Sequence, residues 1–369
     1  MVQANTRIKI TVPQRSYEAI IESGLLGNAG PLVREVLGRG KRLFVVTVEP
    51  VRRRWGKQLA ASLAAHGFDA EVLEMKDGER SKKLASVEQL AEQLTRLGAD
   101  RNAAIIAFGG GVIGDVAGFL ASVYMRGIDV VQIPTTVQAQ LDAAIGGKTG
   151  VNLRTGKNLV GTFHQPTMVL IDPAVLSTLP TREFRAGLYE ALKCGVIGRP
   201  ELFRRLEGIK IKTLRRDIKT LEWVLAESVQ LKAEVVSADE REGDLRRVLN
   251  FGHTIGHALE AESEYKRFLH GEAVAWGMIA ATNIAVSIGK LEPKTAKRIV
   301  DAVLSLGPLP KVKAKSKKIV KLLQTDKKTS HGIVHFVLPT DIGKVEIVND
   351  VPEQVVIKAV DDLRTLSNH

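Results

Sequence analysis

The sequence predicts an α/β N-terminal domain with a parallel, Rossmann-like sheet, followed by a mainly α-helical C-terminal domain. Three observations support this. Short apolar runs alternate with helical segments in the first half of the chain, a glycine cluster follows one of these runs, and helical periodicity dominates beyond about Leu179. At 369 residues the chain is also longer than one ordinary core requires. We therefore expect two domains.

The first half contains the elements of successive βαβ units. Apolar runs predict strands at residues 43–48, 70–73, 103–108 and 129–133. Between them, helical patterns cover residues 50–66, 83–97 and 115–124. This alternation predicts a parallel sheet that binds ligands at its strand ends.

The second half is expected to be helical, with one hairpin. Helices are predicted at residues 181–196, 213–238, 254–263, 271–288, 293–304 and 352–366, and the hairpin at residues 333–348. The expected domains are residues 1–179 and residues 180–369. A cleft is expected between them.

Composition narrows the functional class. Hydrophobic residues make up 44% of the chain and charged residues 25%, which is typical of a globular protein. The single cysteine, Cys194, and the lack of a secretory signal pattern at the start indicate a reducing, cytoplasmic environment. Residues 273–286 are apolar, but they are interrupted and too short to cross a bilayer.

The net charge of +12 raises the possibility of nucleic-acid binding. The basic runs at residues 204–219 and 311–328 lack interleaved aromatic residues and match no nucleic-acid module, so solvated helix faces explain them better. A positive field would also attract a small anionic substrate. We therefore expect no nucleic-acid partner and no membrane partner.

The glycine cluster has the spacing of a dinucleotide-binding turn. Gly109, Gly111 and Gly114 form G-x-G-x-x-G between a predicted strand and a predicted helix, and Gly110 lies within the motif. Glycine lets the backbone approach a diphosphate, and the helix that follows presents N–H groups to it. A plain glycine turn is the competing interpretation. An acidic residue for the adenosine ribose is missing at Val48 and Pro50, so only Glu49 could serve.

A second glycine segment carries cationic and polar residues. Gly146-Gly147-Lys148-Thr149 resembles the end of a P-loop, but Asp142 stands where that motif needs its first glycine. Asp142 and Lys148 are expected on one turn, and Lys157 and Asn158 on a second glycine-flanked turn. Such groups suit a phosphorylated, hydroxylated ligand, although two lysines in surface loops would be unremarkable.

Three histidines indicate a possible divalent-metal site. His253 and His257 are four residues apart and share one face of a predicted helix, and His270 follows after a connection. Thr254 stands where a metalloprotease would carry its general base, which excludes that class. Before any family argument, a structural role for these histidines and a metal-binding role are about equally plausible.

Taken together, these segments resemble the 3-dehydroquinate synthases, members of the sugar-phosphate cyclase family, from Arg15 to about Lys328. The matching blocks are GGGVIGDVAGFLASVYMRG, VQIPTTVQAQLDAAIGGKTGVN, GKNLVGTFHQP, AGLYEALKCG, DEREGDLRRVLNFGHTIGHALE, LHGEAVAWGM and FVLPTDIGKV. Departures from the family pattern include Val48 and Pro50, which make the adenosine contacts uncertain.

The resemblance implies a site for NAD, a site for Zn²⁺ or Co²⁺, and a homodimer. It implies metal ligands at Glu190, His253 and His270, which leaves His257 to act on substrate. Implied catalytic residues are His257, Lys148, Lys193, Lys232, Arg246 and Asn250. Implied substrate contacts are Asp142, Asn158, Lys328 and, from a neighbouring subunit, Arg126. Implied cofactor contacts are Gly109, Gly110, Gly111, Gly114, Asp115, Thr135, Thr136, Lys157, Glu79, Lys82 and Thr178.

The family converts 3-deoxy-D-arabino-heptulosonate 7-phosphate to 3-dehydroquinate and phosphate in the shikimate pathway. Transient oxidation by NAD acidifies a neighbouring C–H bond, phosphate is eliminated, hydride returns, and an aldol step closes the ring. The resemblance implies this lyase reaction. One alternative is a related cyclase acting on sedoheptulose 7-phosphate, although Lys232, Arg246 and Asn250 are retained at the carboxylate-binding positions. A polyol dehydrogenase is another, and it would accumulate NADH.

Overall fold

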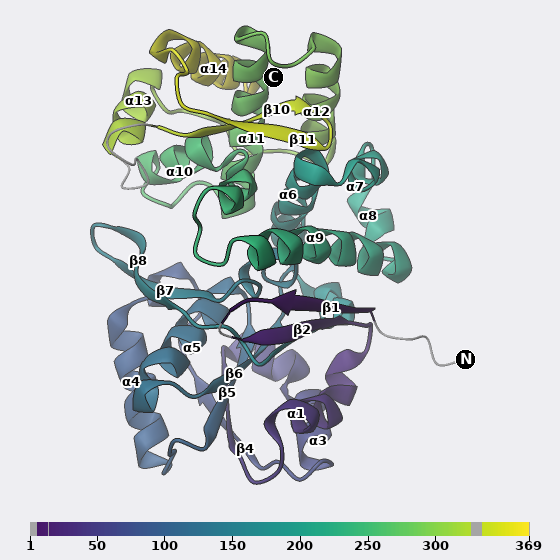
Figure 1. Ribbon diagram of the computed structural model, residues 1–369, viewed down its shortest axis with the longest axis vertical. Coiled ribbons are helices and arrows are strands. Elements are labelled where there is room, and N and C mark those ends of the chain that lie inside the picture. The colour runs from purple at the N-terminus through teal and green to yellow at the C-terminus, as the bar shows by residue number, and fades with distance from the viewer. Residues whose placement is uncertain (1–5, 14, 326–333, 369) are drawn as a thin grey trace. The chain divides into compact units, whose positions relative to one another are not determined.

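The structure is a computed structural model that describes residues 6–13, 15–325 and 334–368 (Figure 1). The chain packs as two compact units. Unit 1 groups Met1–Leu179 with Asp217–Glu240, and unit 2 groups Pro180–Arg216 with Arg241–His369. These units differ from the expected continuous domains in one segment, Asp217–Glu240, whose helix packs against strands of unit 1.

Unit 1 is built on a sheet that, within the described residues, has seven strands in the order β1-β2-β9-β6-β5-β3-β4. Neighbouring strands pair in parallel except for β1 and β2, which are antiparallel. The predicted parallel sheet is confirmed. Its strands are β1 (Thr6–Thr11), β2 (Ser16–Ile21), β3 (Arg42–Thr47), β4 (Ala70–Glu74), β5 (Ala103–Gly109), β6 (Asp129–Pro134) and β9 (Met168–Ile171).

Helices pack against this sheet because its central strands β3, β5 and β6 are buried along almost their whole length and one face of each helix is apolar. Phe44 of β3 and Ile105 of β5 share a buried cluster with Leu94 and Leu120. These two leucines belong to α4 and α5, which are labelled in Figure 1. The α-helices of unit 1 are α1 (Ala29–Leu37), α2 (Glu49–Val51), α3 (Lys57–Ala64), α4 (Leu84–Arg96), α5 (Gly111–Val123) and α9 (Ile218–Ala238). Short helical turns are η1 (Leu25–Asn28), η2 (Arg52–Gly56), η3 (Glu79–Ser81), η4 (Tyr124–Arg126), η5 (Ala139–Ala143) and η6 (Pro173–Thr178).

The segment from Lys148 to Phe163 differs from the expected pair of turns. It forms an antiparallel hairpin of β7 (Lys148–Leu153) and β8 (Gly156–Phe163). Lys157 and Asn158 therefore lie on a strand, and the expectation that they occupy a glycine-flanked turn is wrong. The glycines permit the close pairing, since a Cβ on Gly161 would lie 2.0 Å from the Thr149 carbonyl oxygen.

Unit 2 is mainly helical, as expected. Its elements are α6 (Thr181–Gly198), α7 (Pro200–Leu206), α8 (Ile211–Leu214), η7 (Leu245–Asn250), α10 (His253–Glu262), α11 (His270–Ser287), α12 (Pro293–Ser305), α13 (Ser316–Thr325), the hairpin β10 (Phe336–Asp341) and β11 (Lys344–Val348), and α14 (Glu353–Leu366). The expected hairpin is confirmed from Phe336 onward. Its expected first residue, Ile333, lies outside the described residues.

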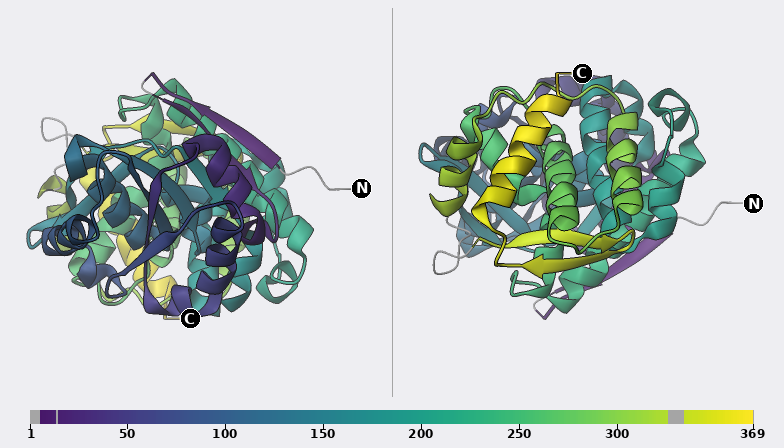
Figure 2. Two further views of the ribbon diagram at one scale, coloured as in Figure 1. Left: turned by 90° about the horizontal axis from the view of Figure 1, so that it is seen from below. Right: turned by 90° about the horizontal axis from the view of Figure 1, so that it is seen from above.

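Helix α11 is the centre of unit 2. It contacts α6, α10, α12, α14 and β10, and α12 and α14 flank it in Figure 2. The approach of α10 to α11 depends on glycine. A Cβ on Gly277 would lie 1.8 Å from the Gly252 carbonyl oxygen, and one on Gly256 would lie 2.9 Å from that of Ala273. This close packing holds the histidines at the start of each helix near one another.

The helix predicted at residues 213–238 is interrupted. Helix α8 ends at Leu214, and α9 begins at Ile218 after Asp217, whose carboxylate accepts a hydrogen bond from the Thr220 N–H at 3.1 Å. Aspartate is a preferred N-cap, because its side chain satisfies an otherwise unpaired helix N–H group. Asp217 therefore explains the new start and the change of unit.

Within the described ranges, none of the helices combines the length and the apolar character needed to span a membrane.

Asp129, at the start of β6, forms ion pairs that contribute to the stability of the fold. Asp129 accepts hydrogen bonds from Lys41 at 2.5 Å and from Arg15 at 2.8 Å. Burial opposes ionisation, but these two cations outweigh it and lower the pKa of Asp129. A carboxylate with a lowered pKa stabilises the fold above its unfolded pKa, and this stabilisation is lost as the pH falls through its folded pKa.

We expect Asp129→Asn to reduce the free energy of unfolding at pH 7 by about 1–2 kcal/mol. Urea unfolding at several pH values checks this. The difference from wild type should shrink below about pH 4, where the carboxylate of the unfolded chain protonates. A difference that stays constant down to pH 2.5 would contradict an electrostatic origin.

Candidate functional site

The predicted dinucleotide turn lies at the carboxyl end of β5 in unit 1. Gly109 ends β5, Gly110 precedes α5, and Gly111 begins it. Thr135, which follows β6, donates its N–H to the Gly109 carbonyl at 2.9 Å. The turn is tight, since a Cβ on Gly109 would lie 2.5 Å from Ile113, and one on Gly110 would lie 3.1 Å from Thr136. The glycines before the first turn of α5 carry no side chains. A diphosphate could therefore come close to the N–H groups of that turn.

Gly114 serves helix–sheet packing. A Cβ at this position would lie 2.9 Å from Gln132 Oε1, and the Gln132 amide donates to the Gly114 carbonyl at 3.1 Å. The third glycine of a dinucleotide motif has this packing function.

Lys82 contacts one residue predicted to bind the cofactor and one predicted to bind the substrate. Its side chain is buried, and its Nζ pairs with the Asp115 carboxylate on α5 and donates to Asn158 Oδ1 on β8 at 2.5 Å. Burial raises the pKa of Asp115, and the charge of Lys82 opposes the shift. Asn158 adopts a positive φ of 54°, which turns its side chain within a strand.

A second polar group surrounds Glu79. Its carboxylate accepts from the Asn152 side chain at 2.8 Å and lies 3.7 Å from Lys157 Nζ. The Asn152 side chain also accepts from the Asn158 N–H at 2.9 Å. Sequence analysis missed Asn152, and only its place in the hairpin reveals that it links Glu79 to Asn158.

Asp142 and Lys232 form an ion pair although they are 90 residues apart. Lys232 on α9 donates to the Asp142 carboxylate and carbonyl oxygens, each at 2.5 Å. The turn that leads on to Lys148 is held by Tyr17, whose hydroxyl accepts from the buried Gly146 N–H at 2.9 Å. Lys148 itself is exposed at the start of β7.

Two further residues of unit 1, Thr178 and Arg126, were predicted to bind the cofactor and the substrate. Thr178 in η6 accepts a hydrogen bond from Trp55, a residue the sequence analysis did not select. Arg126 is exposed in η4 with a φ of 69°.

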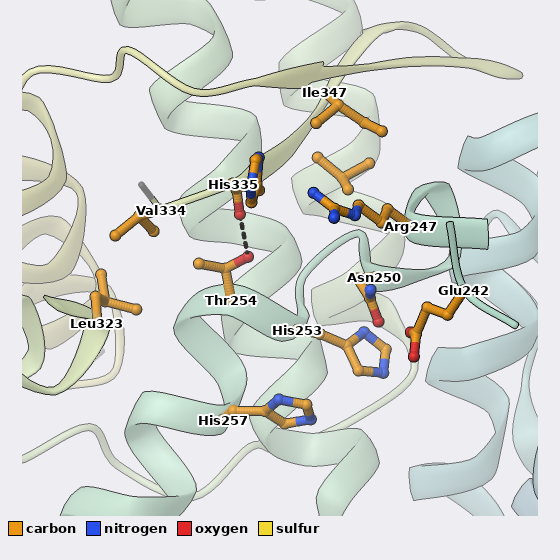
Figure 3. A pocket seen from close by; sticks show the side chains of 11 residues that line it. Glu242, Arg247, Asn250, His253, Thr254, His257, Leu323, Val334, His335 and Ile347 are labelled. Atoms are coloured by element: carbon orange, nitrogen blue, oxygen red, sulfur yellow. Dashed lines mark hydrogen bonds between the residues drawn. The ribbon is translucent and has the colours of Figure 1, made fainter. Parts of the chain in front are cut away.

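In unit 2 the three histidines come together. Their ring centroids are 5.2–5.6 Å apart, and the nitrogens that could bind a metal lie within 4.8 Å of one another. His253 and His257 project to the same side of α10 and line a cavity of about 210 Å³ (Figure 3). The expectation that the two residues share one helix face is confirmed.

Glu190 completes this cluster from α6. Its Oε1 lies 3.3 Å from His270 Nε2 and 3.7 Å from His253 Nε2, and Lys193 Nζ lies 2.6 Å from its Oε2. Burial alone would raise the pKa of Glu190, but Lys193 and the two imidazoles outweigh burial and hold it well below its usual range. Glu190 Oε1 thus faces the Nε2 atoms of both histidines, and a carboxylate oxygen with two imidazole nitrogens is a donor set that a divalent cation could use.

The other ring nitrogens of these two histidines are held by the protein. His270 Nδ1 lies 3.1 Å from the carboxylate of Glu260, and His253 Nδ1 lies 3.2 Å from the Phe251 carbonyl. Burial alone would lower the pKa of His270, but Glu260 and Glu190 outweigh it and raise this pKa to about 10. Glu260 was missed, although its position seven residues after His253 on the same helix was a usable signal.

The remaining predicted residues of unit 2 lie around η7. Asn250 lines the histidine cavity, and Arg246 is buried. Lys328 lies outside the described residues. The cavity also contains Arg247 and His335, which the sequence did not single out (Figure 3).

Glu272 lies two residues after His270, where it could be taken for a further metal ligand. Its buried carboxylate instead pairs with Arg182, with both distances 2.7 Å, and accepts from the Leu269 N–H at 2.9 Å. The Glu272 carboxylate therefore caps the N-terminus of α11.

The resemblance implies that His270 is a metal ligand, and its raised pKa then predicts proton release on metal binding, because a ligand nitrogen must lose its proton. We expect about one proton to be released per ion at pH 8, where the metal-free imidazole is charged and the bound one neutral. Calorimetry of Zn²⁺ binding in buffers of different ionisation enthalpy measures this number. Binding heats that are independent of the buffer would contradict the predicted exchange.

Comparison with known proteins identifies the family. A family model of the 3-dehydroquinate synthase N-terminal region matches residues 72–186, and one of the C-terminal region matches residues 187–329. A 3-dehydroquinate synthase of Koribacter versatilis is 55% identical over 98% of this chain and 99% of its own length. The chain belongs to the 3-dehydroquinate synthase family. The resemblance inferred from the seven sequence blocks is thereby confirmed.

Solved structures extend the likeness of this 3-dehydroquinate synthase family member to related cyclases. A 2-epi-5-epi-valiolone synthase from Streptomyces hygroscopicus, with NAD⁺ and Zn²⁺ bound, has a TM-score of 0.88 and 32% identity over 96% of this chain and 99% of that one. A 2-deoxy-scyllo-inosose synthase complexed with carbaglucose-6-phosphate, NAD⁺ and Co²⁺ has a TM-score of 0.85 and 26% identity, covering 97% and 100% of the two chains. The predicted fold class is confirmed.

Proposed function

We propose that this chain is an NAD- and metal-dependent lyase that converts 3-deoxy-D-arabino-heptulosonate 7-phosphate to 3-dehydroquinate and phosphate. The observation that carries the proposal is the convergence of Glu190, His253 and His270, with His257 beside them, in a chain of this family. In the shikimate pathway this reaction forms the first carbocycle of aromatic amino-acid biosynthesis.

A divalent ion fits the proposed ligands Glu190, His253 and His270. Two imidazole nitrogens and one carboxylate oxygen are a typical donor set for Zn²⁺, and three protein ligands leave positions for substrate oxygens. When bound, Zn²⁺ or Co²⁺ would act as a Lewis acid toward the substrate oxygens, and NAD would accept a hydride and return it. Lys193 balances the charge of Glu190 and keeps this buried carboxylate ionised.

The chain's own residues would position the substrate and move its protons. His257 lines the cavity and is not needed as a ligand in this assignment, so it is proposed to transfer a proton to or from substrate. Buried Arg246, with Asn250 and Lys232, is proposed to bind the carboxylate. Lys148, Asn158 and Asp142 are proposed to bind the phosphate and hydroxyl groups.

The glycine turn at Gly109, Gly110, Gly111 and Gly114 is the proposed diphosphate site. The remaining proposed contacts to NAD are Asp115, Thr135, Thr136, Lys157, Glu79, Lys82 and Thr178. The tight backbone of the turn and the buried pair of Lys82 and Asp115 support this assignment.

The chain is further proposed to act as a homodimer in the cytoplasm. The exposed position of Arg126 is compatible with a contact to the phosphate site of a second subunit. The single cysteine agrees with a reducing compartment.

The proposed reaction is tested by incubating purified protein with NAD, Zn²⁺ and the heptulosonate phosphate, and measuring phosphate, dehydroquinate and NADH together. We expect phosphate and dehydroquinate in equal amounts and no accumulated NADH. Net NADH without phosphate would contradict the proposal in favour of a polyol dehydrogenase. Preferential turnover of sedoheptulose 7-phosphate in a parallel assay would contradict the assigned substrate.

A further inference from the structure

We propose that Glu260 is the positioning residue of the metal site, because its carboxylate fixes the orientation and tautomer of His270. This inference rests on the proposed function, since it assumes that His270 is a metal ligand.

Glu260 is placed beside His270 by its position on α10. Residues 253, 257 and 260 are spaced by four and three along α10, so their side chains leave the same face of the helix. The side chain of Glu260 is buried, and its Oε2 lies 3.1 Å from His270 Nδ1. A buried carboxylate requires a partner, and here an imidazole at the start of a different helix supplies it.

The hydrogen bond to Glu260 determines the tautomer of the His270 ring. A carboxylate only accepts hydrogen bonds, so Nδ1 must carry the proton that it donates to Glu260. The lone pair of the neutral ring is therefore on Nε2, the nitrogen that lies 3.3 Å from Glu190 Oε1. Glu260 thus selects the tautomer in which the coordinating nitrogen faces the cluster.

His253 differs from His270 in the group that accepts a hydrogen bond from its Nδ1. Its Nδ1 is held by the neutral carbonyl of Phe251 at 3.2 Å, and its Nε2 also faces Glu190. Both proposed imidazole ligands are therefore oriented through Nδ1, and the acceptor at His270 is a charged carboxylate. A charge-assisted hydrogen bond is stronger and makes the ring a more basic ligand.

Variants of Glu260 test the proposal through metal affinity, which does not depend on turnover. Glu260→Gln keeps an acceptor oxygen but removes the charge, whereas Glu260→Ala removes both. We expect Zn²⁺ affinity, measured by chelator competition, to fall about 10-fold in the first variant and about 100-fold in the second. The visible absorption spectrum of the Co²⁺-loaded protein should also change in the Ala variant.

Glu262→Gln is the matched control on the same helix. Glu262 accepts a hydrogen bond from Lys318 at 3.3 Å, so this variant should keep wild-type affinity. Glu260 variants that bind Zn²⁺ within twofold of wild type would overturn the proposal. So would a loss in Glu262→Gln as large as that in Glu260→Ala.

A measurement on the wild-type protein keeps the proposal testable if the variants fail to fold. In Zn²⁺-loaded protein, ¹⁵N NMR should show His270 with a protonated Nδ1 and a metal-bound Nε2, and the opposite tautomer would overturn the inference. Failure of the proposed function is distinguishable, because it would appear as wild-type protein that binds no metal or forms no dehydroquinate.

Discussion

Replacing His253 with Ala is expected to abolish metal retention and to reduce turnover at least about 1,000-fold, because loss of Lewis-acid stabilisation costs several kcal/mol. His253 Nε2 is one of two imidazole nitrogens facing Glu190, and its Nδ1 is held by Phe251. Ala at this position leaves only two of the proposed ligands, Glu190 and His270, which are too few for tight binding of Zn²⁺.

His257 provides the matched comparison, since it lies one turn further along the same helix and lines the same cavity. His257→Ala is expected to retain one metal ion per chain and still lose about 100-fold or more in turnover, the range for a lost general acid or base. Metal content after dialysis, measured by atomic absorption beside the turnover rate, separates the two roles. Equal metal loss in both variants would contradict the division and favour coordination by all three histidines.

Replacing Lys82 with Met is expected to weaken NAD binding about 100-fold and to destabilise unit 1 by about 3 kcal/mol, because removing one partner of a buried ion pair leaves the other unpaired. Lys82 contacts both Asp115 and Asn158, so its loss also frees a residue proposed to bind substrate. Calorimetric titration with NAD and urea unfolding measure the two effects.

A second substitution separates these effects. Asp115→Asn, added to Lys82→Met, removes the stranded charge and should restore most of the stability without restoring NAD affinity. Lys83→Met is the control, since its side chain is exposed beside Lys82. Wild-type NAD affinity in Lys82→Met would limit Lys82 to a structural role.

Local patterns predicted much of the fold. Apolar periodicity within one segment predicts the buried strands β3, β5 and β6 and the helices α6, α10, α11, α12 and α14, and the structure places them within a few residues of their expected bounds. Helices α7 and α13 were not predicted. The same holds for the histidine pair, because a spacing of four residues on a helix defines one face before any tertiary contact forms.

Contacts between distant segments could not be predicted in this way. Helix α9 has an ordinary helical pattern, and nothing in that pattern indicates that it packs against β1 and β2 and brings Lys232 to Asp142. The pairing of Lys82 with Asn158 depends on the β7–β8 hairpin, whose glycines at positions 150, 156 and 161 suggest turns in the sequence.

Glu260 is an intermediate case. Its helical face was available from the sequence, but a glutamate on a helix is usually solvated. Only the close approach of α10 to α11, which requires Gly256 and Gly277, shows that it meets His270.

The central claim is that the proposed reaction depends on an oxidation that is later reversed. Dehydroquinate formation by protein loaded with Zn²⁺ and stripped of dinucleotide tests this most directly. We predict no product until NAD is added, and then full activity with NAD regenerated at each turnover. Product formed at the full rate without any dinucleotide would contradict the account.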